Sequence, residues 1–178
     1  MGCDIHIVLE CKWTDSEGTE KWVGTQIDYL SEKALDYTWE RYWEADGVTA
    51  VKHDKPKYTT YLIGRRNYGF FNSLCGVRGQ GSEFGYTDRG LPDDASDMSE
   101  MLLSEDDPDL HSHSWLTIRE LVPCLAAHWG TEGKKPEEYV FERMASPDGN
   151  LYLATELVDE GINAENADEW RLVFAFDN

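Results

Sequence analysis

The feature that most limits the fold is an alternation of apolar and polar side chains over residues 4–13. Successive side chains of a β-strand point to opposite faces. One face then holds Ile5, Ile7, Leu9 and Cys11, and the other holds Asp4, His6, Val8 and Glu10. The first set is typical of a buried face. The second set is either solvated surface or the floor of a site, and we interpret Glu10 as ordinary surface.

Further strands are expected on both sides of the middle of the chain. Residues 14–18 favour a turn, and residues 21–24 then favour a returning strand. Residues 58–63 are rich in β-forming side chains, and residues 171–176 alternate again at the end of the chain. Residues 30–45 fit either an amphipathic helix or an aromatic strand.

Two helices have clear sequence signals. Apolar residues recur at helical spacing over residues 66–75, and Gly76 is a suitable stop. Thr117 and Glu120 form a capping-box pattern, which predicts a helix that begins there and buries Ile118 and Leu121.

Two β-rich runs, 138–144 and 151–155, flank a Pro-Asp-Gly turn and predict a hairpin. The glycine- and acid-rich stretch 76–109 predicts a long surface excursion. There is no strand–helix–strand rhythm, no repeat and no linker. We therefore expect one α+β domain over residues 1–178, with a mainly antiparallel sheet, two or three helices and this long Gly/Asp-rich loop.

The net charge limits the partners. With 16 basic and 35 acidic residues, the formal charge is −19. Such a molecule repels nucleic-acid phosphates and anionic membranes at long range. Residues 93–109 alone carry eight acids, which favours a solvated segment or a mimic of a phosphate backbone that meets a basic partner.

The compartment expected from the sequence is the cytoplasm. The four cysteines are widely spaced and form no CxxC pair, which favours reduced thiols. The first ten residues carry acids where a signal peptide has a basic and then an apolar region, and no apolar stretch approaches the length of a membrane span.

Two groups of residues are candidates for catalysis or ligand binding. Asp4 and His6 share one strand face, and in an extended segment the rings of His111 and His113 would also point the same way. Each pair could act as acid–base groups or hold a divalent metal ion. The alternative is that Asp4 is solvated and that both histidines only line the turn into the helix. No cofactor is required by these residues, and a divalent metal remains an option.

The second group is basic. Four arginines lie within residues 65–89, together with five glycines between residues 76 and 90. A guanidinium fork and glycine backbone N–H groups suit a phosphate, and Tyr68 suits stacking on a base. Ion pairing with the many acids explains the same arginines equally well.

Four blocks of the chain resemble a group of short, functionally uncertain phage and prophage proteins. The blocks are MGCDIH at residues 1–6, RRNYGFFNSLCGVRG at 65–79, RGLPDD at 89–94 and HSHSWLTIREL at 111–121. The resemblance implies a protein that works in a bacterial host cytoplasm during infection. Small phage proteins often disarm host defences, some by binding or cutting nucleotide signals and others by blocking a host protein.

We therefore expect a pocket for a small phosphorylated molecule such as a nucleotide. Its catalytic candidates are Asp4, His6 and His113, and its ligand-binding candidates are Arg66, Tyr68, Arg78, Arg89, His111 and Ser112. If the protein is an enzyme, it is a phosphoester or phosphodiester hydrolase in which an imidazole moves the proton and an arginine stabilises phosphoryl charge. Without chemistry, the same residues make a protein that sequesters its ligand. The alternative is a non-catalytic acidic inhibitor of a basic host protein, and a second copy of the chain is a further possible partner.

Overall fold

A four-stranded antiparallel sheet forms the centre of the protein. The structure is a computed structural model and describes residues 3–14, 18–27, 68–79, 83–86, 88–145 and 162–177. The strand order is β2 (Glu20–Ile27), β1 (Ile5–Thr14), β4 (Trp170–Asp177) and β3 (Leu110–Thr117). The strands expected at the two ends of the chain are confirmed, and they pair with each other from Ile5 opposite Phe176.

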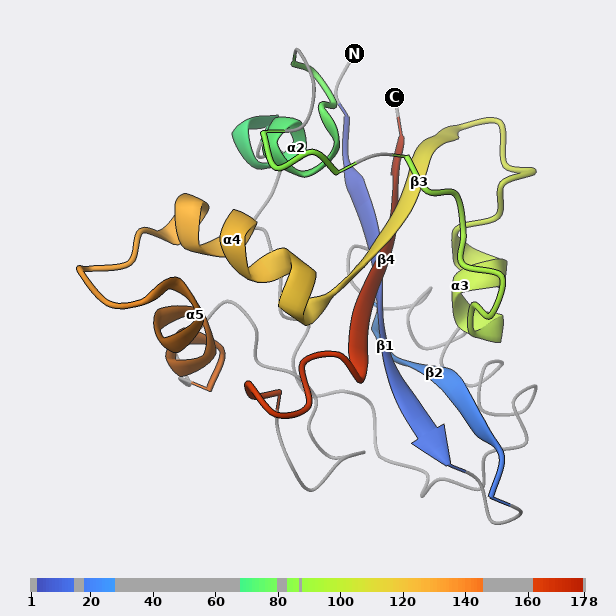
Figure 1. The fold of residues 1–178 in the computed structure, drawn as a ribbon. Helices are drawn as coiled ribbons and strands as arrows, with labels where there is room; N and C mark the ends of the chain where they lie inside the picture. Colours follow the sequence, from blue (N-terminus) through green and yellow to red (C-terminus); the bar gives the residue numbers. More distant parts are fainter. Residues whose placement is uncertain are drawn as a thin grey trace.

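Helices cover both faces of this sheet. They are α2 (Tyr68–Cys75), α3 (Asp97–Leu102), α4 (Ile118–Trp129) and α5 (Pro136–Ala145). Helices α2, α4 and α5 lie on one side of the sheet, and α3 lies on the other (Figure 1). The expected α+β architecture is confirmed, with four helices in the described residues where the sequence indicated two or three.

The larger core lies between the sheet and α2 and α4. Ile5, Ile7 and Leu9 are buried in it, as the alternation in the sequence predicts. Phe71 from α2 packs edge-on against Phe176 of β4, with ring centroids 5.2 Å apart. Burying a side chain of this size contributes about 1.5–3 kcal/mol to folding, so this face holds the sheet and helices together.

The other face of the sheet is also buried. Met98 of α3 and Leu103 pack on Val8, Val173 and Ala175 in a second, smaller core. Helix α3, with Met98, and Leu103 lie within the stretch 76–109, which the sequence predicted to be a surface excursion. The central strand β4 is consequently buried on both faces.

The two helix signals in the sequence are confirmed. Thr117 accepts a hydrogen bond from the Glu120 N–H, and the Glu120 carboxylate accepts one from the Thr117 N–H, which closes the capping box. Gly76 follows the end of α2 with a φ of 72°, a conformation that glycine adopts without a steric cost.

The predicted hairpin is wrong in its first half, because residues 138–144 lie in helix α5. Pro136 occupies the first helical position, where its missing N–H costs nothing, and Glu137 adds a negative charge to the first turn. Val140 and Phe141 are then buried in the core beside α4. The second half, 151–155, lies outside the described residues, as do 30–45, 58–63, Arg65 and Arg66.

Candidate functional site

The start of β1 and the end of β4 form the first candidate site, which we call the sheet-end site. The Asp4 N–H donates to the Asp177 carboxylate at 2.7 Å, and the Asp177 N–H donates to the Asp4 carbonyl at 3.1 Å. His6 Nε2 lies 3.2 Å from the other Asp177 oxygen, and the two side chains are 27% and 33% exposed. Asp177 thus orients His6, and the imidazole stays partly open to solvent.

A second set of predicted residues gathers around Cys3. The Cys3 N–H donates to the Tyr68 hydroxyl at 3.4 Å. Burial raises the pKa of the Cys3 thiol, and the nearby charge and hydrogen bond of Arg78 act in the opposite direction, which places that guanidinium beside Cys3. Arg78 is exposed with a φ of 64°, and Tyr68 is 40% exposed.

A bulge in β3 separates the two histidines of the His-Ser-His run. His111 stands opposite Phe176 and Ser114 opposite Phe174, so Ser112 and His113 both stand opposite Ala175. Ser112 has a φ of 53° at this bulge. His111 and His113 therefore lie on different faces of the sheet, and the expectation that their rings point the same way is wrong.

The register divides the candidate residues between the two faces. Strand alternation puts Asp4, His6 and His113 on the face covered by α3. His111 stacks on Phe176, with ring centroids 6.2 Å apart, on the face of the larger core. Asp4 and His6, the candidates for proton transfer, come near Tyr68 and Arg78, the candidates for ligand binding, at the rim of the sheet. There Cys3, which contacts Tyr68, directly precedes Asp4.

The metal site considered from the sequence is not assembled in the described residues. Strand β4 separates His6 on β1 from the histidines on β3, which puts those strands about 10 Å apart. Within the described ranges, no three His, Cys, Asp or Glu side chains come together as a metal-binding group.

Arg89 has a structural role. Its guanidinium contacts both carboxylate oxygens of Glu120, at 2.9 and 3.2 Å, and donates to the Trp115 carbonyl at 3.1 Å. It also lies over the Trp115 ring, 5.0 Å from the centroid. Ion pairing, one of the two interpretations of the arginine group, therefore accounts for Arg89.

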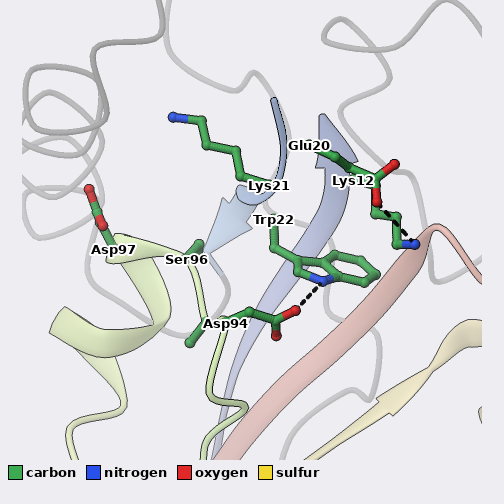
Figure 2. A pocket seen from close by; sticks show the side chains of 8 residues that line it. Lys12, Glu20, Lys21, Trp22, Asp94, Ser96 and Asp97 are labelled. Atoms are coloured by element: carbon green, nitrogen blue, oxygen red, sulfur yellow. Dashed lines mark hydrogen bonds and ion pairs between the residues drawn. The ribbon is translucent and has the colours of Figure 1, made fainter. Parts of the chain in front are cut away.

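A pocket of about 360 Å³ lies at the opposite end of β1 from His6. It lies between the turn end of the β1–β2 hairpin and residues 94–97, and Figure 2 shows Trp22 at its centre. We call it the Trp22 pocket. Its lining side chains are Lys12, Glu20, Lys21, Trp22, Asp94, Ala95, Ser96 and Asp97.

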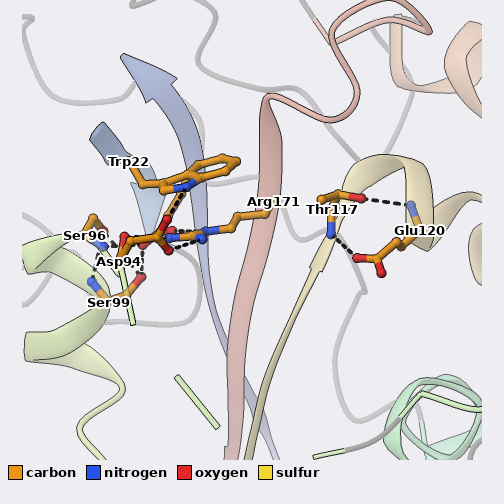
Figure 3. Close-up of polar contacts among 8 residues, drawn as sticks. Trp22, Asp94, Ser96, Ser99, Thr117, Glu120 and Arg171 are labelled. Atoms are coloured by element: carbon orange, nitrogen blue, oxygen red, sulfur yellow. Dashed lines mark hydrogen bonds and ion pairs between the residues drawn. The ribbon is translucent and has the colours of Figure 1, made fainter. Parts of the chain in front are cut away.

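An ionic network centred on buried Arg171 shares Trp22, Asp94 and Ser96 with the lining of this pocket (Figure 3). Arg171 Nε donates to Glu10 at 2.5 Å, and its two terminal nitrogens donate to the Asp94 side chain and carbonyl at 2.7 and 2.9 Å. The other Glu10 oxygen accepts bonds from the Ser96 N–H at 2.8 Å and the Ser99 hydroxyl at 2.6 Å. The interpretation of Glu10 as ordinary surface is wrong, because this carboxylate is fully buried.

Sequence reasoning missed Arg171, Asp94, Trp22 and Asp177. The alternation at each end of the chain predicted β1 and β4, but not that the two strands are neighbours. If the pairing of β1 with β4 were known, the sequence would predict an ion pair, because Glu10 and Arg171 carry opposite charges at directly opposed positions.

The thiols are not activated nucleophiles. Burial raises the pKa of Cys11, Cys75 and Cys124 to about 12, so these groups stay protonated at neutral pH. All four cysteines are free.

Comparison with known proteins identifies no relative, since no protein-family model, no curated protein and no solved structure matches this chain. Among the described helices, none has both the length and the apolar character needed to cross a membrane.

Proposed function

We propose that this protein binds a small phosphorylated molecule, such as a nucleotide signal, at the sheet-end site and hydrolyses its phosphoester bond. The observation that carries the proposal is the contact between His6 and Asp177, in which a carboxylate orients a partly exposed imidazole. An imidazole held in this way is suited to proton transfer.

The remaining parts of the site supply binding. The exposed Arg78 guanidinium offers a planar fork to phosphate oxygens, and the exposed Tyr68 ring offers a surface for a base. Both lie beside Cys3, one residue from Asp4, so a ligand at the rim of the sheet can meet both sets of residues.

A single imidazole can carry the one proton that moves during hydrolysis. With Nε2 bonded to Asp177, His6 takes a proton from the attacking water through Nδ1 while the water oxygen bonds to phosphorus. The P–O bond to the leaving group breaks, and the same proton passes to the leaving oxygen. Arg78 stabilises the negative charge that develops on the phosphoryl oxygens.

The setting that we propose follows from the sequence resemblance described above. A phage-type protein of this kind works in the cytoplasm of the infected bacterium, where removing a nucleotide signal counters host defence. Binding without hydrolysis serves the same purpose by sequestration.

A second candidate function is a non-catalytic acidic inhibitor of a basic host protein. One observation favours it: all eight acids of residues 93–109 are exposed, although Met98, Leu102 and Leu103 in the same stretch pack in the second core against the sheet. This arrangement presents a fixed acidic surface to a basic partner.

Thermal denaturation with a panel of mono-, di- and cyclic nucleotides tests the proposal, with and without Mg²⁺, Mn²⁺ or Zn²⁺. We expect one class of nucleotide to raise the melting temperature and then to disappear from solution. The His6→Asn variant should still bind but lose turnover about 100-fold or more, and Arg78→Gln should weaken binding. Arg119→Gln is the matched control, because Arg119 is an exposed arginine on α4 that pairs with Glu137 and Asp168.

The outcomes separate the candidates. A nucleotide that raises the melting temperature but is not consumed indicates sequestration. If His6→Asn and Arg78→Gln both bind and hydrolyse the nucleotide like the wild type, the sheet-end site is excluded. No shift with any nucleotide, together with salt-sensitive binding to a basic protein, would favour the acidic inhibitor.

A further inference from the structure

The Trp22 pocket has the size and the walls of a small-molecule site. Its volume, about 360 Å³, lies within the range of about 300–1,000 Å³ that is usual for such sites. Lys12 and His6 are six residues apart on β1, or about 20 Å along an extended strand, so this pocket is distinct from the sheet-end site.

The indole of Trp22 is held in place before any ligand arrives. Its Nε1–H donates to Asp94 at 3.1 Å, and the Arg171 guanidinium lies 4.0 Å from the ring centroid. Arg171 is itself fixed by Glu10, and its side chain is only 2% exposed. A ring positioned in this way loses little further freedom when a ligand stacks on it.

Charges of both signs surround the indole. Arg171 contacts Asp94 at 2.7 Å and Glu10 at 2.5 Å. Lys12 pairs with Glu20 at 3.4 Å, and its ammonium lies 5.7 Å from the centroid of the Trp22 ring. Lys21 and Asp97 lie on the side of the pocket away from Lys12 (Figure 2). The lining therefore offers both hydrogen-bond donors and hydrogen-bond acceptors to a ligand.

From these walls we infer that the Trp22 pocket binds a planar heteroaromatic ring, such as a purine base, stacked on Trp22. The edge of a base carries donors and acceptors side by side, which matches the mixed polar rim, and its face matches the fixed indole. The ring is recognised as a neutral group, so a phosphate is not required for binding here.

Titration with adenosine, followed by intrinsic fluorescence and calorimetry, tests this inference. We expect saturable one-to-one binding that weakens roughly tenfold or more in Trp22→Leu, since stacking supplies most of the interaction. Ala95→Leu is a second variant, which adds bulk to the pocket lining without replacing Trp22 or Arg171, and it should weaken binding likewise. Trp129→Leu is the control, because Trp129 packs beside Arg143 on the other side of the sheet.

Three results would overturn the inference. They are no adenosine binding at millimolar concentration, wild-type affinity in Ala95→Leu, and binding that is lost in His6→Asn but kept in Trp22→Leu. The last result would place the ring at the sheet-end site and would support the proposed function while excluding the pocket. If adenosine binds as expected but no nucleotide is hydrolysed, the Trp22 pocket is supported and the proposed hydrolysis at the sheet-end site is excluded.

Discussion

Glu10 and Arg171 face each other across β1 and β4, with 2.5 Å between Oε2 and Nε, and their side chains are 0% and 2% exposed. Each charge is satisfied by further hydrogen bonds, and Arg171 lies between the rings of Trp22 and Trp115, at 4.0 and 5.6 Å from their centroids. The network ties residues 94–99 to the sheet and defines how they cover its second face.

Arg171→Met should destabilise the protein by about 3–5 kcal/mol, because it leaves the Glu10 carboxylate buried without a positive partner. Urea denaturation followed by circular dichroism measures the change. Arg119→Met is the matched control, since Arg119 also contacts two carboxylates but is exposed, and its loss should change stability little.

The double variant Glu10→Leu, Arg171→Met should recover a large part of the stability lost in Arg171→Met. Both buried charges are then gone, and the Asp94 side chain, which is largely exposed, can be hydrated. A double variant less stable than Arg171→Met would show that the pair itself, and not the unpaired charge, is what the fold depends on.

Gly24→Ala should destabilise the contact between β2 and α3 by about 1–3 kcal/mol. A Cβ at Gly24 would lie 2.8 Å from the sulfur and 2.9 Å from the Cβ of Met98, both closer than packed atoms approach. Chemical denaturation of Gly24→Ala, Met98→Ala and the double variant measures the coupling. If the two effects simply add, the close packing of Gly24 on α3 is contradicted.

Features of the fold that depend on residues close together in the sequence were predicted, and features that depend on distant residues were not. The alternation of β1 and β4 and the capping box at Thr117 are local, so they were predicted correctly. The burial of Glu10 depends on a partner 161 positions away, and no local pattern signals it. The helix α5 contains the β-favouring Tyr139, Val140 and Phe141, and packing beside α4 overrides that preference.

The contacts of the candidate residues depend on strand pairing for the same reason. The sequence singled out His6 by its strand face, but its partner Asp177 becomes visible only when β1 and β4 are known to be neighbours. The different faces of His111 and His113 depend on one extra residue in β3, which the sequence does not signal.

The stability supplied by Glu120 should depend on pH. Burial tends to raise its pKa, but the hydrogen bonds and charge of Arg89 and the N–H of Thr117 outweigh burial, so the pKa of Glu120 is lowered. A lowered carboxyl pKa adds stability above the unfolded value of about 4.5, and this stability is lost as the pH falls through the folded value.

Glu120→Gln keeps an acceptor for the cap and removes the charge. At pH 7 we expect it to be less stable than the wild type by up to about 1 kcal/mol, since the ion pair is partly exposed. The difference should shrink as the pH falls below 4.5. Denaturation curves at a series of pH values measure it, and a difference that stays constant down to pH 3 would contradict the ion pair with Arg89.

The central claim is that His6 lies in the ligand site, and the histidine resonances test it most directly. The chain has five histidines, whose imidazole signals can be assigned by substitution and followed by NMR during titration with the nucleotide that stabilises the protein. The account predicts that the His6 signals shift in proportion to occupancy, whereas those of His128, on α4, stay unchanged. Saturation of the protein with the nucleotide while the His6 signals stay in place would contradict the account.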